Sequence, residues 1–374
     1  MADKQFRVYF GNEPATEEEL GSIESIVVEQ EVDMAWEARL QFPLCMDEAG
    51  SWRGLDEDLN KKFSRVRIEI DPGDGQFIPL IDGPLVGYQG DLSSQPGSSL
   101  VHFRFQDDSA KLHRKKKPKY LENKSFQEIV EELFKEIETI ESVEVDELKE
   151  TQESVDPVLF QRLSNMRVIQ EIAEYYNKHG YVLPAETVGK SIGCLKSYPN
   201  ELASDGPPPL VVVGSGRNIS DFHVEAELSK KKRVRSFSFD LGTKSIRWHE
   251  SSFENTNLLG DAEATDGEQE DEDEVLIVPA PSRVDAETYA QGKTDAGSMV
   301  LKGEGSLSHE CYHGVLQPYQ MVTVKAGETK VSTNYVITRV THTITPSIYT
   351  QSFSLVSNAI SDVSISSTPE EAIF

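Results

Sequence analysis

The chain has 374 residues, with 37 Lys and Arg against 64 Asp and Glu, and its formal net charge is −27 at pH 7. This length suits two or three domains that each bury a hydrophobic core. The acidic balance argues against stable nucleic-acid binding, because the neutralisation of phosphate charge supplies most of the affinity in such complexes.

The first 20 residues lack the apolar core of a secretory signal. No apolar run elsewhere in the sequence approaches the roughly 18 residues that cross a bilayer as a helix. We therefore expect a protein that is cytoplasmic when made, is not secreted through a signal peptide and has no membrane segment.

Residues 1–110 are predicted to form the N-terminal part of a first antiparallel β-barrel domain. Between Val28 and Phe42, apolar residues alternate with mostly charged ones, as a half-buried strand or a tight strand pair with a turn near Asp33 requires. Further strands are predicted over Arg65–Ile70, Ile78–Gly87 and Leu100–Phe105. The triplet Asp82–Pro84 is expected to act as a breaker within the second of these.

Residues 111–205 are predicted to form a small α/β module inserted between the β segments. Ser125 followed by Glu128 is typical of a capping box at the start of a helix. A second amphipathic helix is predicted over 165–179, with Gly180 as the glycine that ends it. Its inward-facing residues are predicted to be Val168, Ile169, Ile172, Ala173 and Tyr176.

The run Lys111–Tyr120 is the one dense basic stretch that we identify in this acidic chain. Clustered Lys and Arg are the usual footprint of an anionic partner, yet no aromatic residues interleave with them as in single-strand-binding proteins. We favour a solvated connection whose charges offset the acidic surroundings, with a contact between subunits as the alternative.

Strand patterns return after the module. Residues 206–255 are predicted to supply return strands of the first barrel, and 275–360 a second β-barrel domain. In 261–274, nine of fourteen residues are acidic and none is basic, so we interpret 256–274 as a solvated linker or loop. The tail 361–374 is predicted to be flexible.

One string matches a metal-binding motif: His309, Glu310 and His313 spell H-E-x-x-H. In zinc hydrolases this string lies on a helix, which places the two His one turn apart and the Glu beside the metal-bound water. Gly305 and Gly314 flank the string and disfavour a helix, so we interpret it as a strand or loop. A zinc-dependent hydrolase that uses these three residues stays an alternative, and otherwise we expect no metal ligand.

No other stretch is typical of a catalytic or cofactor site. In 211–220, two glycines follow an apolar run, but Ile219 replaces the third glycine of a dinucleotide fingerprint and a strand pattern follows. The sequence has no P-loop, no G-x-S-x-G elbow and no EF-hand loop. We therefore predict a protein that is not an enzyme and has no catalytic residue and no cofactor.

The arrangement resembles the phage late control D family, the baseplate hub proteins of contractile phage tails and related injection systems. The stretches that carry the resemblance are 7–44, 81–114, 123–134, 165–184 and 315–360. The second stretch ends in a short polar and Leu-basic pattern at Asp107, Ser109, Leu112, His113 and Arg114. The last includes a Y-V-I-x-x-V-x-H pattern at Tyr335, Val336, Ile337, Val340 and His342.

The chain differs from the family pattern at three places. The acidic block 261–274 resembles an insertion between the two barrels. Pro318-Tyr319 stands where the family has a proline-glycine pair, which leaves the turn there open. The sequence ends soon after the last barrel, so the resemblance implies that the spike is a separate polypeptide.

The resemblance implies a structural protein with two tail-tube-like antiparallel β-barrels and an inserted α/β module. It implies a homotrimer that joins a threefold spike to the sixfold ring of the inner tube protein, with the module facing other baseplate subunits. The protein would be incorporated in the baseplate of a phage-tail-like particle. Two alternatives from other classes are the zinc-dependent hydrolase and a soluble ligand-binding β protein, which would be a monomer.

Overall fold

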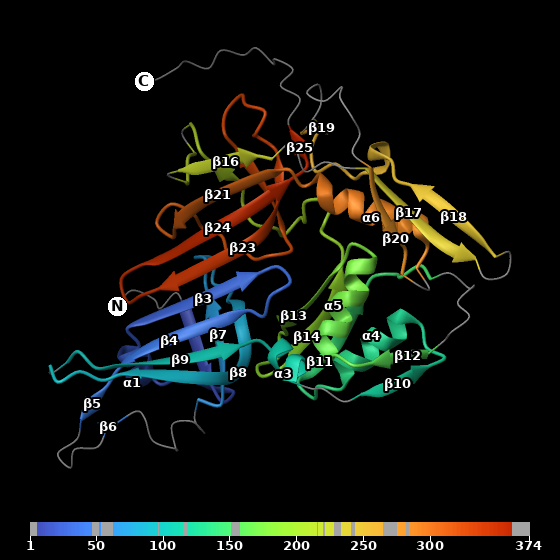
Figure 1. The fold of residues 1–374 in the computed structure, drawn as a ribbon. Coiled ribbons are helices and arrows are strands. Elements are labelled where there is room, and N and C mark those ends of the chain that lie inside the picture. Colours follow the sequence, from blue (N-terminus) through green and yellow to red (C-terminus); the bar gives the residue numbers. More distant parts are fainter. Residues whose placement is uncertain are drawn as a thin grey trace.

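The fold is described from a computed structural model of the chain (Figure 1). The described residues are 6–46, 52–53, 63–95, 97–114, 118–150, 158–214, 216–219, 221–227, 233–240, 244–264, 275–281 and 284–360. They form a mainly β protein in which a long, mostly antiparallel sheet carries a small α/β module on one flank. The predicted fold class is confirmed. Among these residues, strand pairing follows one path from β16 to β2 with a short branch, rather than two separate rings.

The N-terminal half of the sheet has the strand order β3-β4-β9-β8-β7-β1-β2. The long alternating stretch is a tight strand pair, because a turn at Asp33, whose φ is 61°, separates β3 from β4. Met34, which the alternation placed on the apolar face, lies in this turn and is exposed. The elements are β1 Phe6–Phe10, β2 Glu13–Pro14, α1 Glu17–Ser22, β3 Ser25–Glu31, β4 Glu37–Pro43, β5 Cys45–Met46, β6 Trp52–Arg53, β7 Arg65–Ile70, β8 Ile78–Asp91 and β9 Leu100–Gln106.

The predicted break at Asp82–Pro84 is wrong, because β8 continues through it. The strand pairs with β7 up to Pro84 and with β9 from Leu85 onward, so the proline lies where the partner changes. Gly83 lets the two backbones approach closely, since a Cβ there would lie 1.8 Å from the carbonyl oxygen of Gln106. The triplet therefore bends a continuous strand toward a second partner.

The inserted module packs two amphipathic helices against small sheets. The capping box is confirmed: the Ser125 hydroxyl accepts from the Glu128 amide, and the Glu128 carboxylate accepts from the Ser125 amide. All five residues predicted to face inward on the second helix are buried. The elements are α3 Ser109–Arg114, β10 Lys119–Glu122, α4 Phe126–Lys135, β11 Ile140–Val145, β12 Val158–Gln161, α5 Asn165–Tyr175, β13 His179–Pro184 and β14 Ser191–Lys196.

The predicted end of the second helix at Gly180 is wrong. The helix ends at Tyr175, and Asn177 takes the left-handed conformation with φ of 50°. Asparagine tolerates this conformation better than most residues with a side chain. Gly180 lies instead in β13 beneath the helix, where a Cβ would be 2.7 Å from Ile169.

The C-terminal half of the sheet joins the N-terminal half through β23 and β3, which pair antiparallel over six register positions. The expectation that 206–255 returns to the first barrel is wrong in its pairing. β15 pairs with β22, and β16 pairs with β21, so both belong to the C-terminal half. The elements are β15 Leu210–Val211, β16 Phe222–Ala226, β19 Ala262–Glu263, β21 Leu301–Ser308, β22 Met321–Lys325, β23 Asn334–Ile344, β24 Tyr349–Ser357 and β25 Ala359–Ile360.

The remaining strands form a separate three-stranded sheet that we call the arm. It has the order β18-β17-β20 and lies at the end of the molecule away from the β8–β9 hairpin (Figure 1). Helix α6 packs against β17 and β18 and covers one face of the arm. The elements are β17 Arg233–Asp240, β18 Ser245–Glu250, the 3₁₀ turn η2 Phe253–Asn255, β20 Val275–Pro279 and α6 Ala286–Ser298.

Two predicted segments are described only in part or not at all. Of the acidic stretch, 256–264 is described and includes β19, which pairs with β25. Residues 265–274 and the tail 361–374 lie outside the described residues. In the described part of the chain, no helix is long and apolar enough to cross a membrane.

Candidate functional site

The N-terminal half of the sheet meets the inserted module over a buried cluster of charged side chains. Arg65 donates from Nε to Asp82 Oδ1 at 2.6 Å and from Nη2 to Asp108 Oδ2 at 2.9 Å. From the module, the Ser191 hydroxyl donates to Asp108 at 2.7 Å and the Gly189 amide donates to Asp82 at 2.8 Å. Both carboxylates are fully buried. The module therefore docks on the sheet through directional, charge-assisted hydrogen bonds.

This docking explains why all six residues of β7 are buried, although their sequence alternates. Arg67 donates from Nη1 to the carbonyl of Ala185 at 2.6 Å and from Nε to Glu69 at 2.7 Å. The charged face of the strand is thus covered by the module. Lys111, the first residue of the basic run, lies 2.8 Å from Asp108. The run therefore begins at the rim of the buried cluster, where the charge of Lys111 offsets that of Asp108, and 115–117 lie outside the described residues.

The pKa values of the two central carboxyl groups, Asp82 and Asp108, are shifted in opposite directions. Burial alone would raise the pKa of Asp108, but hydrogen bonds and charge from Arg65, with further donors from Lys111 and Ser191, lower it to about 2. Burial raises the pKa of Asp82, and the charge of Arg65 offsets only part of that rise. Arg65 is therefore the group on which the ionised state of Asp108 depends.

Asp107 lies next to this cluster, in the pattern that the sequence marked before the insertion. Its carboxylate accepts from the amides of Trp36 at 2.6 Å and of Ser109 at 2.8 Å. Burial raises its pKa to about 6 in spite of these donors. A carboxyl group whose pKa is higher in the folded than in the unfolded chain makes stability depend on pH.

We expect Asp107→Asn to reduce the change in stability between pH 4 and 6. In this range the folded protein keeps a proton on Asp107 that the unfolded chain has lost, so the free energy of unfolding falls as pH rises. The raised pKa of Asp107 contributes about 1–3 kcal/mol to this fall in the free energy of unfolding, since one pKa unit corresponds to about 1.4 kcal/mol. Urea denaturation of both proteins from pH 4 to 7 measures it. An equally steep fall in the variant would contradict the assignment.

A second buried polar cluster joins the two halves of the sheet. His342 in β23 lies between Gln30 of β3 and Tyr349 of β24, with its Nε2 3.1 Å from Gln30 Oε1 and its Nδ1 2.8 Å from Tyr349 Oη. Gln30 Nε2 donates to the carbonyl of Leu80 at 2.7 Å, which fixes the orientation of its amide group. Burial lowers the pKa of His342 to about 3, so the ring is neutral near pH 7.

The partners of His342 determine its tautomer. Gln30 Oε1 can only accept, so the ring proton resides on Nε2, and Nδ1 accepts the Tyr349 hydroxyl proton. The histidine that closes the Y-V-I-x-x-V-x-H pattern is thus a buried linker between the two halves. The sequence identified this residue, and the structure supplies its role.

Tyr319 resolves the turn that the sequence left open. Its φ is 65°, so a residue with a side chain adopts the conformation that glycine favours. The ring stacks on Tyr181 of the module with 3.6 Å between centroids and 9° between planes. Its hydroxyl accepts from the Asp33 amide, at the tip of the β3–β4 turn, at 2.9 Å. One side chain therefore contacts both the module and the N-terminal half from a position in the C-terminal half.

Further contacts surround this three-way junction. His179 lies 3.0 Å from the Asp33 carboxylate and stacks on Tyr198 with 4.1 Å between ring centroids. Gln170 of α5 donates to the carbonyl of Asp33 at 3.0 Å. The module is thus fixed to the strained β3–β4 turn as well as to the buried charges. These contacts indicate a rigid unit made of both sheet halves and the module.

The HECYH string lies in a turn after β21 and not on a helix. His309, Glu310 and Cys311 form the turn, and the rings of His309 and His313 lie edge to face at 5.5 Å. Tyr312 between them is buried and donates to the carbonyl of Pro208 at 2.8 Å. The helical register that a zinc hydrolase needs is absent from this string. Within the described ranges, no group of three His, Cys, Asp or Glu could hold a metal ion.

A polar cleft of about 770 Å³ separates the module from α6. Several of its polar lining groups bind other protein groups: Lys178 Nζ donates to Asp146 at 3.2 Å, and the neutral side chains of Gln291 and Thr256 both donate to Asp295. Such internal pairing is typical of a boundary between two packed parts. It gives little support to the alternative of a ligand-binding β protein, whose pocket would present polar groups to a ligand.

Comparison with solved structures shows that this is the fold of tail proteins. The 43 kDa tail protein of prophage MuSo2 from Shewanella oneidensis is 10% identical, with a TM-score of 0.62 over 95% of this chain and 98% of that one. The tail protein of Neisseria meningitidis MC58 is 13% identical, with a TM-score of 0.59 over 95% and 97%.

A third similar structure is an E. coli component of the type VI secretion system, described as similar to T4 bacteriophage tail proteins. It is 10% identical, with a TM-score of 0.53 over 90% of this chain and 73% of that one. No protein-family model and no curated protein matches the sequence. At these identities the likeness concerns the fold alone.

Proposed function

We propose that this protein is a structural baseplate hub of a contractile tail or injection system. The observation that carries the proposal is that nearly the whole chain shares its fold with nearly the whole of two tail proteins. In this role three copies form a homotrimer that joins a separate threefold spike protein to the sixfold ring of the inner tube.

The two sheet halves support this symmetry argument. Each chain contributes two β units that are held together by the β23–β3 pairing, so a closed ring of three chains presents six units. A ring of this kind meets a threefold partner on one face and a sixfold partner on the other. The inserted module lies outside the ring and faces other baseplate subunits.

The proposal includes what the chain does not do. It acts as a structural protein without catalysis or cofactor, and its large negative charge keeps it from retaining nucleic acid. It is made in the cytoplasm and then incorporated in the baseplate of the particle. Its division into domains follows the one predicted from the sequence, except that the strands of 206–255 belong to the C-terminal half of the sheet and to the arm.

End-on electron-microscopy class averages of the purified chain test the proposal, with the mass in solution as a check. We expect a threefold ring with an open centre and a six-lobed rim. A monomer at every protein concentration, alone and with a spike protein, would contradict the proposal. That outcome would instead favour the monomeric ligand-binding alternative.

A further inference from the structure

One face of the arm is apolar and exposed. Antiparallel pairing places Phe239 opposite Ile246 and Phe237 opposite Trp248, and the last two rings lie 5.1 Å apart. The parallel strand β20 adds Ile277 on the same side, beside Arg235. Exposed fractions on this face are 57% for Phe239, 52% for Ile246, 52% for Trp248 and 56% for Ile277.

The opposite face of the arm is occupied, which fixes the direction of these side chains. Val234 and Ser236 alternate with the exposed residues of β17 and are buried. Helix α6 packs on this side, where the hydroxyls of Thr294 and Ser251 lie 2.6 Å apart. The arm therefore has its core on one side, and the aromatic face turns away from it. Exposed apolar groups gathered in this way mark a binding surface in most soluble proteins.

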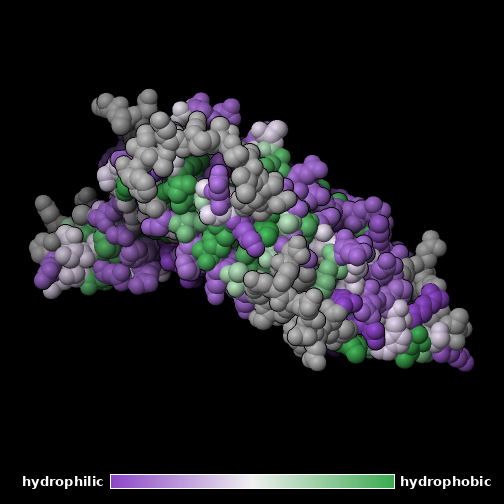
Figure 2. All heavy atoms as spheres, turned by 90° about the horizontal axis from the view of Figure 1, so that it is seen from above, coloured by the Kyte–Doolittle hydropathy of each residue, from purple (hydrophilic) through white to green (hydrophobic). Residues whose placement is uncertain are grey.

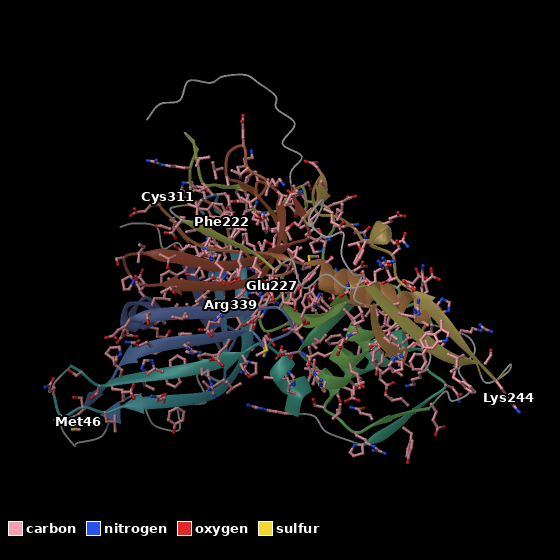
Figure 3. The ribbon with its side chains drawn as sticks, turned by 45° about the horizontal axis from the view of Figure 1, so that its top comes forward. Met46, Phe222, Glu227, Lys244, Cys311 and Arg339 are labelled. Carbon is pink, nitrogen blue, oxygen red and sulfur yellow. The ribbon has the colours of Figure 1, made fainter. Side chains whose placement is uncertain are left out.

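The arm projects from the molecule. Figure 3 shows Lys244 at the tip of the β17–β18 hairpin, at the end of the molecule opposite Met46. In Figure 2, hydrophobic side chains lie among hydrophilic ones at this right-hand end. A face at the end of a projecting hairpin can reach a neighbouring molecule without any change in the rest of the fold.

The charge of the arm identifies the kind of partner. Residues 230–250 contain seven Lys and Arg against two Asp and Glu, so their net charge is +5 and the remainder of the chain carries −32. This second basic run was missed from the sequence, where only Lys111–Tyr120 was named as basic. Of the described residues, Arg233 and Arg235 lie on the side of Phe237, where the single carboxylate Glu250 pairs with them at 3.7 and 2.6 Å. The face therefore suits a partner with an acidic surface.

We propose that the arm face binds a second copy of this chain, and this inference rests on the homotrimeric hub proposed above. A neighbouring copy is such an acidic partner, because its chain outside residues 230–250 carries a formal charge of −32. The arm of one copy contacts a different surface of the next, so the interface is heterologous. Such contacts close into a ring when the rotation between copies is 120°. The arm thus supplies an attraction that offsets repulsion between strongly acidic bodies.

The test compares the wild type with a Phe239→Ser/Trp248→Ser double variant by light scattering across a range of concentrations. We expect a trimeric wild type and a variant whose association constant is at least about 30-fold weaker, since a central interface tryptophan commonly contributes that much. The matched control is Leu163→Ser/Leu202→Ser, because both leucines are exposed to a similar extent outside the arm.

The outcomes separate this inference from the hub proposal. A double variant that stays trimeric would overturn the arm interface and leave the hub proposal intact. This holds also if that variant no longer binds a spike or tube protein, because the arm face would then bind that partner and not a second copy. A wild type that is monomeric at every protein concentration, alone and with a spike protein, would overturn both. Circular dichroism shows that the variant is folded, and hydrogen exchange shows whether β17 and β18 are protected in the wild-type trimer. Missing protection there would also contradict the interface.

Discussion

Replacing Arg65 with methionine is expected to lower the free energy of unfolding at pH 7 by about 3–5 kcal/mol. The guanidinium is the shared partner of Asp82 and Asp108, and both carboxylates are fully buried. Methionine fills a similar volume but leaves two buried carboxyl groups without that cation. Because Asp108 also binds Ser191 of the module, loss of the ion pair should loosen the module first. Urea denaturation measures the change.

The matched control is Arg39→Met. Arg39 also pairs with two carboxylates, Glu29 and Glu37, but its side chain is 51% exposed. We expect a loss below about 1 kcal/mol there, because solvent screens exposed ion pairs. Equal effects at Arg65 and Arg39 would contradict the role of the buried cluster.

The pH dependence of the Arg65 variant gives a second readout. The lowered pKa of Asp108 stabilises the folded wild type at neutral pH, and this contribution is lost as pH falls from about 4 to about 2. The variant lacks the cation that lowers the pKa, so it has little of this contribution to lose. The difference in stability between the two proteins should therefore narrow over the same range.

Replacing His342 with leucine should lower the free energy of unfolding at pH 7.5 by about 2–5 kcal/mol, because two buried groups each lose a partner. Gln30 Oε1 would lose its donor and the Tyr349 hydroxyl its acceptor. Both losses fall at the joint between the two sheet halves. His223→Leu is the control, since that histidine lies on β16 and is exposed.

The effect of His342→Leu should shrink at low pH. The folded-state pKa of about 3 lies below the unfolded value near 6.5, so the unfolded chain binds more protons between these values. The free energy of unfolding of the wild type therefore falls as pH decreases from about 6.5 toward 3. The leucine variant has no titrating ring at this position and does not show this part of the fall. Denaturation at pH 7.5 and pH 5 distinguishes the two cases. A constant difference would mean that the ring is not neutral and buried as described.

The sequence predicted those elements whose side chains alternate between solvent and core. β3 and β4 were found because one face is apolar and the other polar, and α4 because its capping box is local. These signals reside within a few neighbouring residues. They are therefore visible without knowledge of what packs against them.

Other elements were missed because their patterns depend on distant partners. In β21, Gly303 and Gly305 lie under aromatic rings, and a Cβ at Gly303 would lie 2.6 Å from Phe222. Helix α6 buries Ala286, Ala290, Thr294 and Ser298, a face of small residues with little apolar contrast. Neither pattern is typical of its structure in isolation.

The junctions could not be predicted from the sequence at all. Tyr319 takes a glycine conformation because Tyr181 and Asp33, from two other parts of the chain, hold its ring and hydroxyl. The charges of β7 alternate like a solvated face until the module covers them. Buried polar clusters of this kind bring together residues more than a hundred positions apart, and their local sequence carries no trace of the contact.

The antiparallel pairing of β23 with β3 has a mechanical consequence. A force directed along these two strands would pull the two sheet halves past each other. Strands loaded lengthwise share the force among all their hydrogen bonds, whereas strands peeled from one end break them in sequence. The six paired positions from Ile26 to Glu31 would then resist shear together, reinforced by the Gln30–His342 contact between the two strands. Such a joint resists a brief, strong pull far better than a flexible linker of the same length.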